Sequence, residues 1–410
     1  MIATDRPALR DYLHANRARE TALLSELVRA PSDNPPGDLA AAAERAAELL
    51  EALGLKVERH QVPADLVRAQ GMRSVTNLVV RRRFGAGGKV IALNAHGDVV
   101  PPGEGWTADP YGAEIRDGWM YGRGAAVSKS DIASYAFALL ALDHAKAARH
   151  GAVELHITYD EETGGEIGPR WLLEQGISKP DLAIGAGFSY AVVEAHNGCL
   201  HLEVEVTGRS AHAARPWTGI DALEGATRIL AALYAWRPML TARNSAIPGI
   251  GAPQMTIGLI AGGINTNVVP DRVTFRLDRR IVPDERPEQV ETELRTLITE
   301  AAAGDPAVTV AVRRILLAAP LTPMPGGAVL SELLCAHATR VMGERVVPGG
   351  VPLYTDARHY AAAGVPIVLY GAGPRSIEEA NAHRADERLP LEDLYKATEV
   401  VALTLADLLA

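Results

Sequence analysis

The sequence has little cysteine, no excess of positive charge and no long hydrophobic run. Two cysteines, Cys199 and Cys335, cannot form a disulfide framework in 410 residues, which favours a reducing compartment. The formal net charge of −9 argues against a polyanionic partner such as nucleic acid. The longest apolar stretch, near 132–142, is far shorter than the ~20 residues that span a membrane. The first 20 residues are too charged for a secretory signal. We therefore expect a cytoplasmic protein with neither nucleic acid nor membrane as a partner.

The rest of the composition is that of an ordinary globular protein, with 48% hydrophobic and 22% charged residues. Glycine and proline are only slightly more frequent than average, which excludes collagen-like and low-complexity chains. At roughly 150 residues per domain, the length predicts two or three domains.

Alternating strands and helices predict an α/β sheet in the first half of the chain. The segments 89–95 and 152–159 are apolar and strand-like, and 131–147 between them has the spacing of a helix. Each strand runs directly into a polar cluster, at 96–98 and at 160–162. Ligands of α/β sheets bind beyond the carboxyl ends of the strands, so both clusters are candidate site residues.

The pattern changes near residue 197. The segments 199–206 and 272–277 alternate as strands with one solvated face, and helices are expected at about 221–235 and 287–303. This order predicts an α+β domain at 197–315, inserted into a larger α/β domain made of 1–196 and 316–410. A strand at 366–370 and a helix at 393–409 complete the larger domain.

Asp160, Glu161 and Glu162 give the strongest local signal. Three adjacent carboxylates at the end of an apolar strand repel one another, and a bound cation would supply the counter-charge. A solvated acidic turn is the alternative interpretation.

Two histidines are candidate ligands of the same cation. His96 and Asp98 are two residues apart at a strand end, so their side chains point the same way and the carboxylate can orient the imidazole. His383 lies in a polar loop. A structural His–Asp turn and a surface histidine are the alternatives.

In combination these motifs resemble the dinuclear metallohydrolase family of aminoacylase, acetylornithine deacetylase, succinyl-diaminopimelate desuccinylase and carboxypeptidase G. The resemblance covers the chain from about residue 20 to the C-terminus. The motifs follow in one order: His96–Asp98, Trp106 with 109–111, Tyr121–Lys129, Asp160–Glu162, Gly208 with 210–212, Gly262–Gly263 leading to Pro270, Asp278 with Arg280, Thr355–Arg358 and His383. It implies a mixed-sheet, phosphorylase/hydrolase-like metallopeptidase domain. It also implies an inserted ferredoxin-like lid domain through which two chains form a homodimer.

The resemblance also implies roles for individual residues. His96, Glu162 and His383 match metal ligands, Asp98 the carboxylate that supports His96, and Glu161 the general base that activates a metal-bound water. His212 matches a residue that reaches across a dimer to stabilise the tetrahedral oxyanion. Arg280 and an asparagine, Asn265 or Asn267, match positions that hold a substrate carboxylate.

The chain departs from the family pattern at two positions. Val127 stands where the family has an aspartate that bridges both metals, and Ala186 aligns with a further acidic ligand. Since divalent cations need four or more donors, the usual dinuclear site cannot form. Asp131, one helical turn after Val127, is a candidate substitute ligand.

We therefore expect a hydrolase of an amide or peptide-like C–N bond in a small, carboxylate-bearing substrate. Its cofactor would be one divalent metal ion per chain, with zinc favoured over manganese or cobalt. Two alternatives keep the fold: a metal-independent enzyme using Glu161 and His96, and a non-catalytic small-molecule-binding protein. A serine hydrolase built on Ser189 or on 128–130, and a phosphate loop at 85–89, match their motifs poorly.

Overall fold

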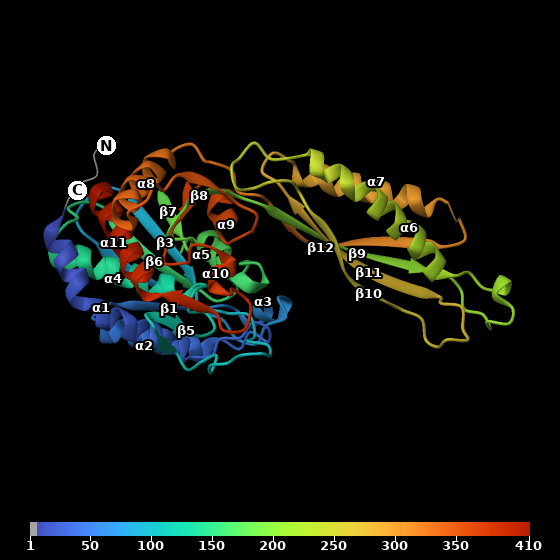
Figure 1. Cartoon of the computed structure of the whole chain (residues 1–410), viewed down its shortest axis with the longest axis horizontal. Coiled ribbons are helices and arrows are strands. Elements are labelled where there is room, and N and C mark those ends of the chain that lie inside the picture. The colour runs from blue at the N-terminus through green and yellow to red at the C-terminus, as the bar shows by residue number, and fades with distance from the viewer. Residues whose placement is uncertain (1–5, 305) are drawn as a thin grey trace. The chain divides into compact units, whose positions relative to one another are not determined.

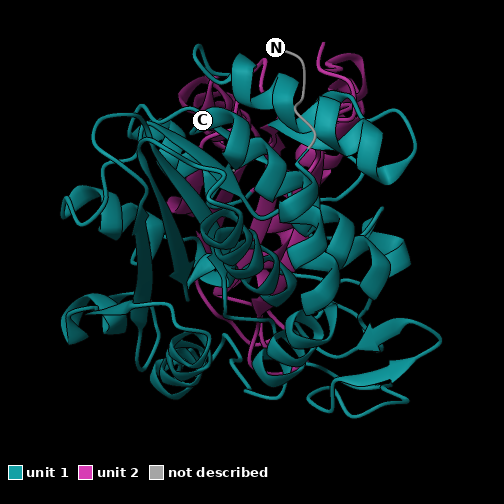
Figure 2. Ribbon diagram, turned by 90° about the vertical axis from the view of Figure 1, so that its left-hand side faces the viewer, with its two compact units in different colours: residues 1–194, 323–349, 355–410 teal, residues 195–322, 350–354 magenta. Residues whose placement is uncertain are grey.

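A computed structural model describes residues 6–304 and 306–410, which form two compact units. The first unit comprises residues 6–194, 323–349 and 355–410, and the second comprises 195–304, 306–322 and 350–354 (Figure 2).

The first unit is built on a mixed eight-stranded sheet with the order β1-β2-β6-β3-β7-β14-β8-β13 (Figure 1). Strands β3, β6, β7 and β14 run parallel to one another, whereas β1, β2 and β8 pair antiparallel with their neighbours. The strands are β1 (Val57–Gln61), β2 (Thr76–Arg83), β3 (Val90–His96), β6 (Ala152–Thr158), β7 (Leu182–Gly185), β8 (Val192–His196), β13 (Pro348–Val351) and β14 (Ile367–Leu369). The mixed α/β sheet expected from the sequence is confirmed.

Helices cover this sheet, and four of them pack on one another: α1, α4, α8 and α11. Helix α4 is buried on nearly all sides, because it is apolar around most of its circumference. The helices of this unit are α1 (Pro7–Val28), α2 (Ala40–Ala52), α3 (Ala64–Ala69), α4 (Lys129–Ala145), α5 (Pro169–Glu174), α8 (Ala328–Met342), α9 (Ala357–Ala362), α10 (Ile377–Ala380) and α11 (Leu391–Leu408).

A small three-stranded sheet with the order β15-β5-β4 completes the first unit. Its strands are β4 (Glu114–Arg116), β5 (Trp119–Tyr121) and β15 (Arg388–Pro390). In this sheet β5, which precedes the loop 122–128, pairs with β15, which follows the loop of His383.

The second unit is an antiparallel four-stranded sheet with the order β10-β11-β9-β12. Its elements are β9 (Gly198–Thr207), α6 (Ala222–Trp236), β10 (Met255–Gly262), β11 (Arg272–Ile281), α7 (Pro287–Ala302) and β12 (Thr309–Ala318). The β-α-β-β-α-β sequence with this strand order is the ferredoxin-like arrangement. Helices α6 and α7 pack on one face, against Leu200, Leu202, Val204 and Val206 of β9.

The second unit is larger than the expected insertion at 197–315. Strand β12 continues to Ala318, so a boundary at residue 315 would cut through it. The segment 350–354 also belongs to this unit, since its backbone bonds to Asn197 and Pro248. No helix among residues 6–304 and 306–410 is long and apolar enough to cross a membrane.

Candidate active site

The site begins where two parallel strands end side by side. His96 is the last residue of β3 and lies opposite Thr158, the last residue of β6. The chain after β6 turns through Tyr159 and Asp160 into a short 3-10 helix, Glu161–Thr163. Parallel pairing therefore brings the two polar clusters of the sequence to one edge of the sheet.

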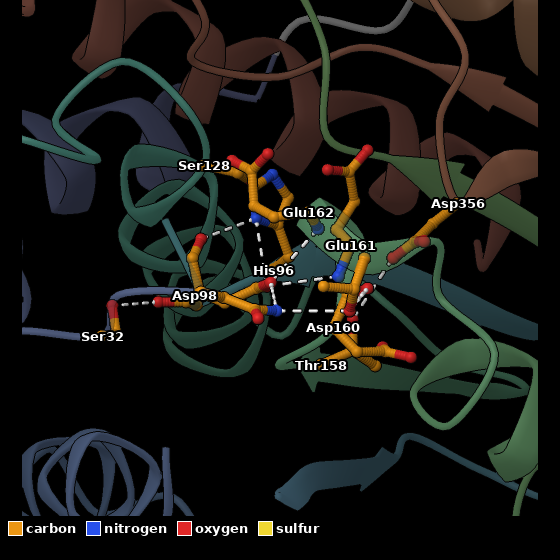
Figure 3. A network of polar contacts seen from close by, with 12 residues as sticks. Ser32, His96, Asp98, Ser128, Thr158, Asp160, Glu161, Glu162 and Asp356 are labelled. Atoms are coloured by element: carbon orange, nitrogen blue, oxygen red, sulfur yellow. Dashed lines mark hydrogen bonds and ion pairs between the residues drawn. The ribbon is translucent and has the colours of Figure 1, made fainter. Parts of the chain in front are cut away.

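Asp98 bonds both to His96 at the end of β3 and to the 3-10 helix that follows β6. The Nδ1 atom of His96 lies 2.9 Å from the backbone oxygen of Asp98, so a proton on Nδ1 is donated there and Nε2 faces the site. The buried Asp98 carboxylate accepts backbone N–H groups from Glu161 at 3.3 Å and Glu162 at 3.2 Å. Figure 3 draws these contacts, which hold the strand end and the 3-10 helix together.

Ligand-type atoms of His96, Glu161 and Glu162 lie within 4.8 Å of one another. Burial alone would lower the pKa of His96, but Asp98 and the two glutamates outweigh burial and raise it well above its usual value. Burial, with a smaller contribution from the carboxylates of Glu162 and Asp98, raises the pKa of Glu161 to about 8, although His96 opposes the shift. The cluster therefore favours positive charge at its centre, from a proton or from a cation.

Asp160 does not share this site, although it adjoins Glu161 in the sequence. Its Oδ2 atom accepts the backbone N–H of Ile167 at 2.7 Å, which fixes the loop after the 3-10 helix. The expectation that three consecutive carboxylates face one cation is therefore wrong for the first of them.

His383 is the third predicted ligand, and its Nε2 atom lies 3.4 Å from Glu162 Oε1. Its backbone adopts a left-handed conformation with φ of 61°, which is uncommon for a residue other than glycine. Asp386 anchors the loop by accepting the backbone N–H and the hydroxyl of Thr107, both at 2.9 Å. Hydrogen bonding to Glu162 raises the pKa of His383.

The two positions that depart from the family pattern supply no ligand atom. The half-buried Val127 packs against the hydrophobic core, and its backbone N–H bonds to Glu387. Ala186 directly follows β7, and its N–H bonds to the carbonyl of Asn94 in the neighbouring strand β3. Both side chains are apolar, so neither can replace a carboxylate.

Asp131, the candidate substitute for Val127, bonds to groups outside the cluster of His96, Glu161 and Glu162. Its Oδ1 atom accepts the backbone N–H of Ala372 at 2.7 Å, and Ser128 Oγ lies 3.3 Å from Oδ2. Burial raises its pKa to about 7. Asp131 thus stabilises the turn after β14, and it is not a member of the cluster around His96.

Three contributors to the site carried no assigned role in the sequence analysis. Asn34 donates to Asp98 Oδ2 at 2.9 Å, and Asp356 is buried so close to Glu161 that the glutamate helps to raise its pKa. Glu387 holds the loop that carries Val127. Asp356 lies in the Thr355–Arg358 motif, so this motif is one indication in the sequence that it belongs to the site. Asn34 and Glu387 lie in no motif, and their part in the site follows only from their contacts in the folded chain.

His212, Asn265, Asn267 and Arg280 all belong to the second unit. The Nδ1 atom of the exposed His212 accepts the backbone N–H of Ala214 at 3.1 Å, so a neutral imidazole carries its proton on Nε2. An isolated β-bridge pairs His212 with Val268, so the loop that carries Asn265 and Asn267 lies beside His212. Arg280 donates to Asp278 Oδ1 at 3.0 Å and lies over the ring of Tyr354.

The serine-hydrolase alternatives find no support in the geometry. Ser189 is fully buried, and its hydroxyl has no hydrogen-bond partner within the described part of the chain. Lys129 donates to the backbone oxygen of Ala30 at 2.8 Å. Neither residue lies in an arrangement that activates a serine nucleophile.

Comparison with known proteins agrees with this geometry. Residues 92–407 match Peptidase family M20/M25/M40. The chain is 30% identical to an acetylornithine deacetylase of Myxococcus xanthus over 87% of this chain and 89% of the relative. It is 31% identical to a succinyl-diaminopimelate desuccinylase of Sphingopyxis alaskensis over 86% and 88%. The structure resembles an M20 family metallo-carboxypeptidase of Sulfolobus solfataricus, with a TM-score of 0.76, 19% identity, and 94% and 98% of the chains covered.

The fold and the His96–Glu161–Glu162 edge define a hydrolase of the amidohydrolase and metallopeptidase type. The chain belongs to peptidase family M20/M25/M40, which confirms the resemblance found in its motifs.

Proposed function

We propose that this enzyme hydrolyses an amide or peptide-like C–N bond in a small, carboxylate-bearing substrate, such as an N-acyl amino acid or a dipeptide, in the cytoplasm. The observation that carries the proposal is the convergence of His96, Glu161 and Glu162 within 4.8 Å at the carboxyl ends of β3 and β6. The deacetylase and desuccinylase relatives support this substrate class.

The donor set fits one divalent ion. His96, Glu162 and His383 would hold it, with Glu161 beside them, and three protein ligands plus an open position are typical of catalytic zinc. Imidazole and carboxylate also accept manganese or cobalt. A second ion would need donors at positions 127 and 186, which are Val127 and Ala186. We therefore propose one ion per chain, most suitably zinc.

When bound, the ion supplies Lewis-acid polarisation of the scissile carbonyl and a lowered pKa of the attacking water. Glu161 takes the proton of that water and passes it to the amide nitrogen as the C–N bond breaks. Burial, which raises the pKa of Glu161, helps this carboxylate to keep the proton between the two steps. Asp98 keeps His96 Nδ1 protonated and the ring in place.

We assign recognition of the substrate to residues of the second unit. Arg280 supplies a guanidinium for the substrate carboxylate and is oriented by Asp278; Asn265 and Asn267 would contribute amide donors. His212 would donate its Nε2 proton to the oxyanion, which suits the tautomer fixed by Ala214.

We further propose a homodimer through the second unit, with His212 acting on the partner's substrate. Strand β10 is at an edge of the four-stranded sheet, and Leu259 and Ile260 on it are 60% and 57% exposed. An exposed apolar edge strand favours pairing with another chain, and two-fold dimers are the commonest oligomers.

A panel of N-acyl amino acids and dipeptides tests the function, assayed after chelation and again with one equivalent of zinc. We expect turnover that chelation abolishes, and a loss of roughly 100-fold or more in kcat for Glu161→Gln, since the general base is removed. Glu174→Gln, an exposed glutamate in α5, is the matched control and should keep its kcat. Full activity in the chelated protein, or in Glu161→Gln, would contradict the proposal.

A further inference from the structure

A second cluster of ligand-type side chains lies on the sheet of the second unit. Cys199 and His201 are two residues apart on β9, so they share one face, and Asp278 on β11 lies directly opposite His201. This is the face opposite Leu200 and Leu202, which pack against the helices. Side-chain exposure is 34% for His201 and 27% for Asp278, whereas Cys199 is buried.

The three ligand-type atoms form a triangle. His201 Nε2 lies 3.0 Å from Cys199 Sγ and 2.8 Å from Asp278 Oδ2, and Cys199 Sγ lies 3.6 Å from the same oxygen. Among the residues that the structure describes, this is one of two groups whose ligand atoms converge within 4.8 Å.

The geometry is that of a shared centre and differs from a cysteine–histidine–aspartate relay. A relay uses both ring nitrogens, one for the nucleophile and one for the carboxylate. Here both partners approach the same nitrogen, Nε2, while the thiol can itself donate to Asp278 Oδ2, so all three contacts meet on one side of the ring. The three atoms therefore face one another, as the ligands of a single positive centre do.

We propose that Cys199, His201 and Asp278 bind a zinc ion. Thiolate, imidazole and carboxylate are the side chains that zinc takes in proteins, and the thiolate disfavours manganese and magnesium. Arg280 holds Asp278 Oδ1 at 3.0 Å and thereby leaves Oδ2 directed toward the other two ligands. Water or a further group completes the coordination at the open side of His201.

The spacing suits an ion after a small adjustment. Zinc bonds of about 2.3 Å to sulfur and about 2.0 Å to nitrogen or oxygen, in a tetrahedron, place ligand atoms about 3.3–3.6 Å apart. The sulfur–oxygen edge already has this length, and the two edges at Nε2 are each about half an ångström shorter. The side chains are partly exposed at His201 and Asp278, so they can move by that amount.

Cobalt titration of the full chain tests this site separately from the hydrolase site, whose ligands include no sulfur. A cobalt–thiolate bond gives a charge-transfer band in the near ultraviolet. We expect the band in the wild-type chain, in Cys335→Ser and in His96→Ala, and its loss in Cys199→Ser. Cys335 is the matched control because it is the other cysteine, in helix α8. No band in the wild type, or a band that persists in Cys199→Ser, would overturn the proposal.

Zinc X-ray absorption on the wild-type chain gives a second readout that needs no variant. We expect a sulfur neighbour at about 2.3 Å from part of the bound zinc. His201→Ala, at a partly exposed position that tolerates truncation, should remove that sulfur signal together with about one equivalent of zinc. A zinc spectrum with only nitrogen and oxygen neighbours would overturn the site. The hydrolase proposal does not depend on either result.

Discussion

Val127 and Ala186 place apolar side chains at two positions where the family pattern has acidic residues. Val127 lies within the retained motif Tyr121–Lys129, which makes this departure visible in the sequence. Ala186 directly follows β7 and adjoins no retained motif. The hydrogen bond between Asp131 and Ala372 could not be predicted from the sequence, because the two residues are 241 positions apart in the chain. The spacing of residues along a helix predicts which face a side chain occupies. It does not predict which backbone N–H group donates a hydrogen bond to the carboxylate.

Glu20 is a single residue with a measurable pH signature. It is buried in α1, and its Oε1 atom lies 2.5 Å from Thr398 Oγ1, which lies 2.9 Å from the carbonyl of Leu394. The hydroxyl has one proton, so both contacts are hydrogen bonds when Glu20 is itself protonated. Burial raises the pKa of Glu20 from 4.5 to about 8, in agreement with this arrangement.

We expect Glu20 to make the folded state less stable as pH rises. Its pKa is higher in the folded chain, so its stabilisation is complete below pH 4.5 and is lost as the pH rises through about 8. The limiting slope is about 1.4 kcal/mol per pH unit. The measurement is the difference in melting temperature between the wild type and Glu20→Gln across this range. A difference that does not change with pH would contradict a buried, protonated Glu20.

At the scale of elements, one buried ion pair connects the small sheet to the loop of Val127. Arg123 and Glu387 are each about 1% exposed and approach to 2.6 Å. Glu387 Oε1 also accepts the backbone N–H groups of Gly124 and Ala126, both at 3.1 Å. The pair therefore shapes the turn that leads into α4.

Glu387→Gln should destabilise the fold by roughly 3–5 kcal/mol, because the charge of Arg123 is then left buried without its partner. The measurement is the loss in melting temperature. Glu392→Gln breaks the exposed pair with Arg17 and is the matched control, with an expected change of about 0.5 kcal/mol or less. Equal losses in the two variants would show that the buried pair has no special part in stability.

The strands that end in polar clusters were predictable, since apolar runs that stop at charged residues identify carboxyl ends. The expected strand at 152–159 is β6, and the expected helix at 131–147 is α4, each within two residues. The direction of Asp160 was not predictable. It depends on backbone N–H groups at Ile167 and Gly168, which face the carboxylate only after the loop has folded.

At the scale of the molecule, sequence alternation predicted an inserted α+β domain but set its end too early. Strand β12 contains two adjacent arginines, Arg313 and Arg314, and its register shifts directly after them, so its alternation of apolar and polar residues is interrupted before its end. The segment 350–354 joins the second unit through backbone hydrogen bonds, which leave no trace in the composition.

The homodimer proposal predicts that two defective chains complement each other. Glu161→Gln lacks the base and His212→Ala lacks the proposed oxyanion donor, so each alone should have a strongly reduced kcat. If His212 acts on the partner's substrate, coexpression gives mixed dimers with one intact site. Random pairing should then restore about a quarter of the wild-type kcat. A coexpressed sample no more active than the mean of its two parents would mean that His212 does not cross the dimer.

The central claim is that this altered edge holds one metal ion. The most direct test is zinc content per chain, by inductively coupled plasma mass spectrometry, in Cys199→Ser after dialysis against zinc. This variant lacks the thiolate of the second unit, so the count reports the site of His96, Glu162 and His383. We predict close to one equivalent, falling to none when His96→Ala is added. Two equivalents would mean a dinuclear site despite Val127 and Ala186, and none would mean that the edge does not bind metal; either result contradicts the account.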